Sequence, residues 1–236
     1  MDQNPEEITF IDFKCPHCGC SVSFPETSID SVQECPSCSQ ILIVPDRGIQ
    51  VGATLPIPMK TSRLLLRRLA SPDSGDLLEL NADDESFRYI DWNPVEEQEV
   101  EDWLAKDQST RLTENGAPLR LGIETLEHPK VVGLISLYFT NEDRRQMSFS
   151  AMMNCAHRRR GFGTEAIRGA MNFAFTGLKI HRLSASCDSR NIGALRMLDK
   201  AGLRREGQSI KAEFRKGEWV DTVWFALLRE EYESIT

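Results

Sequence analysis

The sequence lacks an apolar run that could cross a membrane, and it lacks a secretion signal. No stretch of the 236 residues approaches the about 18 apolar residues of a membrane-spanning helix. The first residues, MDQNPEEITF, are acidic and have neither the basic start nor the apolar core of a signal peptide. We therefore expect a cytoplasmic protein with no membrane partner, whose thiols stay reduced.

Positive charge is also scarce. The formal net charge is −8, and residues 1–55 hold eight acidic and two basic residues, which gives −6. The remaining residues therefore carry −8 − (−6) = −2. Proteins that bind nucleic acid through bulk charge are basic, so nucleic acid is an unlikely partner for either part of the chain.

The seven cysteines are an odd number, which argues against a full disulfide framework. Four of them form two C-x2-C pairs separated by sixteen residues: Cys15, Cys18, Cys35 and Cys38. This spacing is typical of a four-thiolate Zn²⁺ site, and such a site has no open position for catalysis. A redox dithiol or a disulfide pair does not explain two matched pairs. His17 and Cys20 are interpreted as bystanders.

The cysteine pairs and a later Pro/Gly segment predict a small N-terminal domain. Residues 10–45 resemble a zinc ribbon, with short strands expected at 21–24 and 40–44. So small a unit needs the metal to fold. Pro45 to Lys60 carries three prolines and two glycines and reads as a linker, assigned to 46–60. Residues 61–232 form the second predicted domain. The acidity of the ribbon favours a protein partner, or a basic part of the substrate, over nucleic acid.

A glycine-rich turn dominates the second domain. Gln146–Met153 reads as a strand, three arginines follow at 158–160, and Gly161-Phe162-Gly163 opens a helix. Glycine permits close approach of the backbone, and helix starts leave amides unpaired. The pattern predicts an anion site that suits a pyrophosphate. A solvated basic turn is the alternative.

The elements around this turn have clear periodicities. Apolar residues from Ala166 to Leu178 recur at helical spacing, and His181 to Cys187 alternate as in a strand. A helix at 192–201 is closed by Gly202. Further strands are expected at 62–69, 118–125, 131–138, 203–214 and 218–228, and further helices from 76 and at 96–108. Trp219 and Trp224 are expected to pack in the core or at its rim.

These residues resemble the GNAT N-acetyltransferases. Arg158-x-x-Gly161-x-Gly163 is similar to their acetyl-CoA signature, and RRGFGTEAIRGAMNFAF followed by DSRNIGALRMLDKAGLRREG resembles the ribosomal-protein-alanine N-acetyltransferase branch. The resemblance covers roughly residues 60 to 230. It implies an α/β fold, with a mixed, mostly antiparallel central sheet flanked by helices, and acetyl-CoA as cosubstrate.

The resemblance also implies where acetyl-CoA binds. The pantetheine arm would lie between the strands at 146–153 and 180–188, with a backbone N–H near Met152 or Met153 facing the thioester oxygen. The pyrophosphate would sit on the amides from Arg159 to Thr164, and Asn191 would contact the pantetheine. The implied cofactor-binding residues are Met152, Met153, Arg158, Arg159, Arg160, Gly161, Phe162, Gly163, Thr164 and Asn191.

Two departures leave the catalytic residues unknown. Relatives carry a serine or a tyrosine where this chain has Ala194 and Leu198, and either hydroxyl would protonate the leaving thiolate. Ser150, Glu124 and Glu85 are candidate acids or bases, and nothing in the sequence selects among them. Cys155 and Cys187 are interpreted as core thiols rather than nucleophiles.

The resemblance implies an N-acetyltransferase whose acceptor is a primary amine, and we expect either a protein N-terminus or a small molecule. The stretch from Asp83 to Asp102 contains nine acidic residues and a single basic one, Arg88. It is either a solvated surface or a wall that attracts a cationic amine. An acyl-CoA-binding sensor without turnover is the alternative function, because both hydroxyls are missing. CoA release with a panel of amines distinguishes the two.

Overall fold

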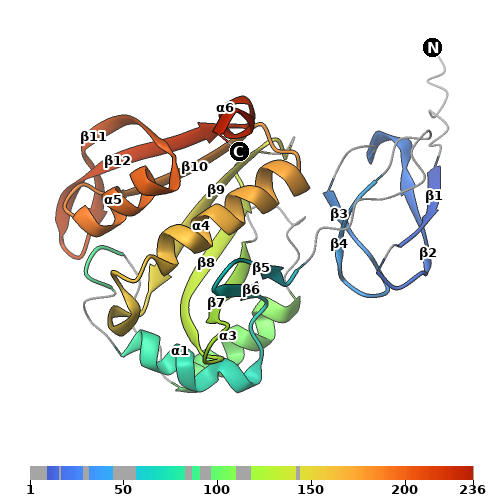
Figure 1. Ribbon diagram of the computed structural model, residues 1–236, viewed down its shortest axis with the longest axis horizontal. Helices are drawn as coiled ribbons and strands as arrows, with labels where there is room; N and C mark the ends of the chain where they lie inside the picture. The colour runs from blue at the N-terminus through green and yellow to red at the C-terminus, as the bar shows by residue number, and fades with distance from the viewer. Residues whose placement is uncertain are drawn as a thin grey trace, which may run out of the picture. The chain divides into compact units, whose positions relative to one another are not determined.

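Figure 1 shows a computed structural model of the chain, which describes residues 10–15, 17–28, 32–44, 57–82, 87–90, 97–109, 118–141 and 144–235. The chain divides into two compact units, Met1–Pro56 and Ile57–Thr236. This division falls inside the segment that was assigned as a linker, while the domain bounds themselves stay a prediction. Within the described residues, no helix is long and apolar enough to span a membrane.

The N-terminal unit is built from two antiparallel hairpins. β1 (Phe10–Lys14) pairs with β2 (Ser21–Pro25), and η1 (Glu26–Ser28) follows as a single 3-10 turn. β3 (Val32–Glu34) pairs with β4 (Ile41–Ile43). The buried core consists of Ile11, Cys15, Val22, Cys35, Leu42 and Val44. Two members of this small core are cysteines, so the cysteine cluster is part of what holds the unit together.

The second unit is organised on an eight-stranded sheet of order β11-β12-β10-β9-β8-β7-β6-β5. The strands are β5 (Met59–Lys60), β6 (Leu64–Arg67), β7 (Leu119–Thr125), β8 (Val131–Phe139), β9 (Gln146–Met153), β10 (Arg182–Asp188), β11 (Arg204–Arg215) and β12 (Glu218–Leu228). Every neighbouring pair is antiparallel except β9 and β10, which are parallel. The predicted mixed, mostly antiparallel sheet is confirmed.

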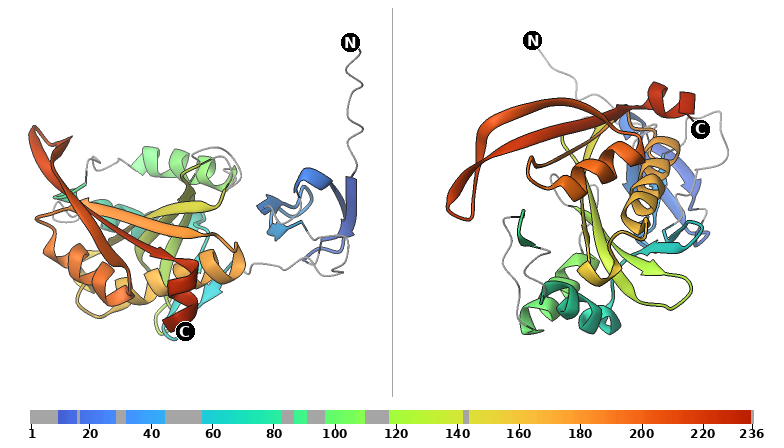
Figure 2. Two further views of the ribbon diagram at one scale, coloured as in Figure 1. Left: turned by 90° about the horizontal axis from the view of Figure 1, so that it is seen from above. Right: turned by 60° about the vertical axis from the view of Figure 1, so that its left-hand side comes forward.

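Helices cover both faces of this sheet (Figure 2). They are α1 (Ser74–Asn81), α3 (Glu97–Ser109), α4 (Phe162–Asn172), α5 (Ile192–Ala201) and α6 (Arg229–Ile235), with short turns η2 (Ser71–Asp73), η3 (Cys155–His157) and η4 (Phe173–Gly177). α1 and α3 share a buried cluster with Leu134 of β8, and Met152 of β9 packs against it. α4 and α5 lie on the opposite face (Figure 2). Two faces covered by helices give the α/β architecture.

Several elements match the expected bounds, and a few do not. The strands at 146–153 and 218–228 and the helix at 192–201 agree with β9, β12 and α5. Three strands were missed: β1, β3 and β5. β5 lies at the end of the expected linker, and it joins the sheet by pairing with β6.

The expectation that Trp219 and Trp224 pack in the core or at its rim is wrong. Their side chains are 60% and 44% exposed. Trp219 lies near the tip of the β11–β12 hairpin, where its ring meets Phe214 edge-on at 5.5 Å. Trp224 donates from Nε1 to the Ser209 hydroxyl at 2.9 Å. These contacts of the two indoles are therefore with other residues of the hairpin, Phe214 and Ser209.

Candidate functional site

The central feature of the second unit is an opening between β9 and β10. Their parallel pairing covers only Gln146–Ser148 against Arg182–Ser184 among the described residues. Beyond these residues the strands part, and a cleft of about 160 Å³ lies there. Phe149–Met152 line it from β9 and Ala185–Asp188 from β10, with Ala194, Met197 and Leu198 contributed by α5 and Asn191 by its N-cap. The opening lies between the two strands that the family resemblance named.

The chain leaves β9 directly into the arginine turn. η3 is capped by Asn154, whose side chain accepts from the Ala156 N–H at 2.9 Å, and α4 begins at Phe162. Gly161 is the N-cap of α4 at φ +82°, and as a glycine it has no side chain to accept from the first helical amides. These amides have no acceptor within the helix, and the helix dipole adds positive potential there. The turn is therefore suited to an anion.

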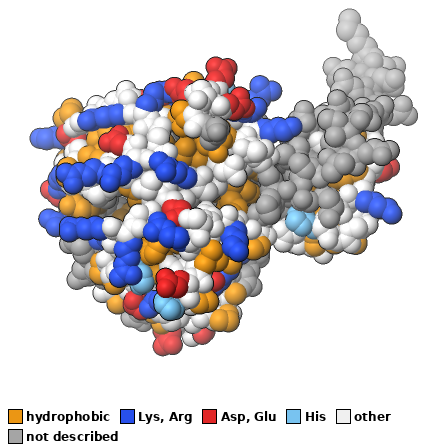
Figure 3. All heavy atoms as spheres, viewed as in Figure 1, with side chains coloured by type: hydrophobic (Ala, Val, Ile, Leu, Met, Phe, Trp, Pro, Cys, Tyr) orange, Lys and Arg blue, Asp and Glu red, His pale blue; other side chains and the backbone are white. Residues whose placement is uncertain are grey.

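The three arginines of the turn have different surroundings. Arg158 is half-buried, and its Nε donates to the Met153 carbonyl at 3.1 Å. Arg159, at φ +61°, and Arg160 are exposed. Figure 3, which has the same view as Figure 1, shows Lys and Arg side chains spread over the visible face of the second unit. Arg158 therefore ties the turn to the end of β9, while its two neighbours offer their charge to solvent or to a ligand.

Gly161 and Gly163 serve different purposes. A Cβ on Gly161 would lie 3.3 Å from the Arg63 guanidinium, and its φ already disfavours other residues. A Cβ on Gly163 would lie 2.4 Å from the Met197 sulfur of α5. Gly163 was expected to open the backbone to the pyrophosphate. The structure gives it a further reason, which is close packing of α4 against α5.

A carboxylate that the sequence did not single out holds the first turn of α4. Glu165 Oε1 accepts from the Thr61 hydroxyl at 2.7 Å, the Ser62 hydroxyl at 3.1 Å and the Arg63 amide at 2.8 Å. Its Oε2 accepts from Arg63 Nε at 2.7 Å. Burial alone would raise the pKa of Glu165, but these hydrogen bonds outweigh it and lower the pKa. The carboxylate thus joins the β5–β6 hairpin to the helix start.

Arg63 completes this connection from the other side. Its Nη1 donates to the Arg160 carbonyl at 3.0 Å, and its guanidinium lies 4.8 Å from the centre of the Phe162 ring. A cation over an aromatic face is attracted by the ring quadrupole. Arg63 therefore contacts the turn both before and after Gly161, which fixes the backbone where an anion would bind.

We expect Glu165→Gln to destabilise the second unit by about 2 kcal/mol, since hydrogen bonds to charged groups contribute about 1.5–3 kcal/mol each. The folded pKa lies below the usual 4.5, so the stabilisation is present above pH 4.5 and is lost as the pH falls through the folded value. Urea unfolding at pH 7 and at acid pH measures this. Glu218→Gln is the control, because that side chain is 58% exposed. Equal effects of the two variants at pH 7 would contradict the role of Glu165.

Asn191 lines the cleft and caps the start of α5. Its Oδ1 accepts from the Ala194 N–H at 3.0 Å, so the oxygen of this side chain is engaged by the helix start. The neighbouring Asp188 is buried and accepts two hydrogen bonds from the Arg190 guanidinium, at 2.9 and 2.7 Å. These bonds lower the pKa of Asp188, so it is a structural anion of the cleft wall.

Of the three candidate acids and bases, Ser150, Glu124 and Glu85, only Ser150 is found in the lining of the cleft among the described residues. Glu124 lies outside its lining, because its carboxylate pairs with Arg67 on β6. Glu85 lies outside the described residues. Ala194 and Leu198 both line the cleft, so neither of the two expected hydroxyl positions supplies a proton.

Cys155 and Cys187, the two cysteines near the site, differ in how far they are buried. Cys155 is exposed at the first position of η3, after β9 has ended, so its assignment to the core is wrong. Cys187 is half-buried on β10 and lines the cleft. Burial raises the pKa of Cys187 to about 11, which keeps it a neutral thiol at physiological pH.

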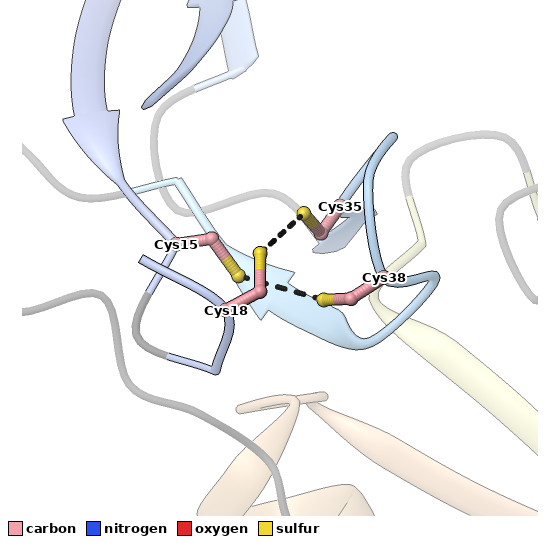
Figure 4. Close-up of side chains that lie close together, drawn as sticks. All are labelled: Cys15, Cys18, Cys35 and Cys38. Atoms are coloured by element: carbon pink, nitrogen blue, oxygen red, sulfur yellow. Dashed lines mark hydrogen bonds between the residues drawn. The ribbon is translucent and has the colours of Figure 1, made fainter. Parts of the chain in front are cut away.

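In the N-terminal unit the four predicted metal ligands come together. Figure 4 shows the sulfur atoms of Cys15, Cys18, Cys35 and Cys38 directed toward one another. All four lie within 4.8 Å of one another, so the group could hold a metal ion. The Cys15–Cys38 sulfur distance is 3.8 Å and the Cys18–Cys35 distance is 3.7 Å. Tetrahedral zinc with Zn–S bonds of about 2.3 Å separates its sulfurs by about 3.8 Å.

The two cysteine turns have the same backbone geometry. The Gly19 amide donates to the Cys15 carbonyl at 2.8 Å, and the Ser39 amide donates to the Cys35 carbonyl at 2.8 Å. Gly19 and Ser39 both have positive φ, +73° and +55°. The glycine was recognisable from the sequence. Ser39 was not, because serine gives no sign that it adopts a left-handed conformation.

Comparison with known proteins identifies the second unit. The acetyltransferase (GNAT) domain model matches residues 63–204, which is more than half of the 236 residues. The chain therefore belongs to the GNAT acetyltransferase family and is an N-acetyltransferase of this type. The family match begins after the cysteine cluster, so it does not account for the N-terminal unit.

Individual relatives agree with this assignment. "Probable N-acetyltransferase YjcK" of Bacillus subtilis is 29% identical over 75% of this chain and 99% of its own length. "Spermidine N(1)-acetyltransferase" of Vibrio cholerae is 24% identical over 72% of this chain and 96% of its own length. A structure of RimL, a ribosomal L7/L12 alpha-N-protein acetyltransferase in complex with coenzyme A, has a TM-score of 0.62 at 17% identity, covering 73% of this chain and 97% of that one. At that identity the last likeness concerns the fold.

Proposed function

We propose that this protein binds acetyl-CoA along the arginine turn and the β9–β10 cleft, and transfers its acetyl group to a primary amine. The observation that carries the proposal is the parting of β9 and β10 directly beside the start of α4. A parted strand offers main-chain hydrogen bonds to an extended arm, and a helix start offers amides to a pyrophosphate. Few other ligands combine these two requirements.

The pyrophosphate would accept from the amides of Phe162, Gly163 and Thr164. Arg159 and Arg160 add Coulomb attraction that salt screens, since both are exposed. Arg158 contributes through the backbone, because its guanidinium already donates to the Met153 carbonyl. The Arg63–Glu165 pair holds this turn in place. The pantetheine would then run along β9 toward Asn191.

Strand alternation favours one of the two methionines as the donor to the thioester oxygen. The Asn154 amide donates to Val132 of β8 at 2.9 Å. Amides of a strand point alternately to its two sides, so the Met152 amide also faces β8, and the Met153 amide would point away from β8, to the side on which β10 parts from β9. A backbone N–H directed at the thioester oxygen stabilises the charge that develops there when the amine attacks.

For the acceptor, we propose a protein N-terminus as the first candidate and a small polyamine as the second. Relatives of both kinds exist, since one is named for spermidine and another for a ribosomal protein. The experiment is a panel of acceptors: peptides with a free N-terminus, the same peptides blocked at the N-terminus but carrying lysine, and spermidine. Mass spectrometry of the products identifies the acetylated nitrogen. No acetylated product from any acceptor would contradict the proposal.

The second candidate function is an acyl-CoA sensor that does not turn over. It is favoured by one observation, which is that Ala194 and Leu198 line the cleft where relatives have hydroxyls. Its signature is tight acetyl-CoA binding by calorimetry together with no CoA release for the whole panel. CoA release that depends on the amine would exclude it.

For the N-terminal unit, we propose a structural zinc ribbon. The sulfur distances of 3.7 and 3.8 Å fit a tetrahedral zinc ion. Cys15, Cys18, Cys35 and Cys38 would hold the ion, which would supply folding energy to a core of six residues. A protein partner, or a basic part of the substrate, would contact this acidic unit.

A further inference from the structure

We propose that the hydroxyl of Tyr89 donates the proton that the leaving CoA thiolate needs. This inference rests on the proposed acetyl transfer. Tyr89 lines the same cleft as Ala194 and Leu198, the two positions where a family hydroxyl is missing. It comes from the segment between α1 and α3, so its hydroxyl would reach the reaction from a different element of the fold.

The proposed step balances as follows. The neutral amine attacks the thioester carbonyl carbon, and a C–N bond forms. When the tetrahedral intermediate collapses, the C–S bond breaks and the Tyr89 O–H transfers its proton to the sulfur. The nitrogen loses its extra proton to water, and solvent returns a proton to the phenolate. The products are the acetylated amine and CoA thiol, and no other reactant is required.

The structure holds the Tyr89 backbone against the cleft. Arg215 of β11 donates from Nη1 to the Tyr89 carbonyl at 2.8 Å. The preceding Phe87 is buried, and its carbonyl accepts from the Ile90 amide at 3.2 Å. The Arg88 guanidinium lies 5.4 Å from the centre of the Tyr89 ring.

The other protic groups of the cleft suit this step less well. Asp188 is an anion held by Arg190 and has no proton to give. Arg215 does not lose its proton in proteins. The serine hydroxyls in the cleft wall are far weaker acids than a phenol. Cys187 remains, and burial raises the pKa of its thiol. Tyr89 and Cys187 are therefore the two groups that the experiment must separate.

The test compares Tyr89→Phe with Tyr138→Phe and Cys187→Ser, using acetyl-CoA and the best acceptor of the panel. Tyr138 is a half-buried tyrosine of β8 outside the lining of the cleft, so it controls for removal of a phenol. We expect Tyr89→Phe to lower kcat by about 100-fold, within the 10²–10⁴ range of general acids, with acetyl-CoA affinity within threefold of wild type. The Tyr138→Phe control should stay within threefold in kcat, and Cys187→Ser should lose less of kcat than Tyr89→Phe.

A second donor separates catalysis from a structural effect. An acetyl thioester of a strongly acidic aryl thiol needs no proton on its leaving sulfur, so the Tyr89→Phe defect should shrink at least tenfold with it. An equal defect with both donors, or kcat within threefold of wild type, would overturn the role of Tyr89. A large loss in Cys187→Ser alone would assign the proton to the thiol. Wild-type protein without turnover would overturn the transfer function and this inference together.

Discussion

Replacing Cys15 with serine is expected to release the zinc ion and unfold the N-terminal unit, while acetyl-CoA affinity stays nearly unchanged. Cys15 is both a proposed ligand and a member of the small buried core, so the substitution removes metal and packing together. The second unit has its own eight-stranded sheet and its own proposed cofactor turn. Metal analysis should fall from about one zinc per chain to none, and the amide signals of residues 10–44 should collapse to those of an unfolded chain.

Cys20→Ser is the matched control for this experiment, because Cys20 is exposed and lies outside the cluster. It should keep its zinc and its folded N-terminal unit. If loss of zinc in Cys15→Ser also abolished acetyl-CoA binding, the two units would not fold independently. If Cys15→Ser instead kept one zinc ion per chain, Cys20 would be assigned as the fourth ligand in place of Cys15.

Replacing Gly161 with valine is expected to weaken acetyl-CoA binding by roughly 10- to 100-fold while the fold survives. A β-branched residue strongly disfavours φ +82°, so the turn must change its course and misdirect the amides that face the pyrophosphate. Hydrogen bonds to charged groups contribute about 1.5–3 kcal/mol, which corresponds to this loss. Calorimetry on the folded variant measures it.

Gly217→Val separates backbone strain from loss of the anion site. Gly217 has φ +87° in the β11–β12 turn, and a Cβ there meets no described atom within 4 Å. It should cost similar stability and leave acetyl-CoA affinity unchanged. Unchanged affinity in Gly161→Val would remove the pyrophosphate from this turn.

Gly163→Val should fail by a different route. The added side chain would strike Met197, which lines the cleft, so we expect loss of packing between α4 and α5 and a partly filled cleft. The double variant with Met197→Ala should recover part of the stability and of the affinity. If the only role of Gly163 were to let the backbone approach the pyrophosphate, the Met197→Ala substitution would restore neither stability nor affinity.

The features that could be predicted from the sequence are those whose residues recur at short, regular spacings. The C-x2-C pairs, the alternating pattern of β9 and the Gly-x-Gly at the start of α4 each lie within one short segment. Each of these motifs could be recognised from its own segment or from the family resemblance, without knowing which residues contact it. For this reason β9, α5 and the cysteine cluster were recognised without coordinates.

Features that depend on distant contacts could not be predicted. Glu165 receives its hydrogen bonds from residues about 100 positions earlier, so its sequence neighbours give no hint of them. Glu124 was a reasonable candidate base until its pairing with Arg67 of a neighbouring strand was known. Gly163 owes its packing role to Met197 in another helix. Short strands such as β5 hold too few residues to show a period.

Hydrogen–deuterium exchange of the whole protein, with and without acetyl-CoA, tests the central claim most directly. The account predicts slower exchange at two places: the amides of Phe162 to Thr164, and the Met153 amide at the end of β9. The N-terminal unit should show no change. Protection that omits both the turn and β9, in protein shown by calorimetry to bind acetyl-CoA, would contradict the proposed site.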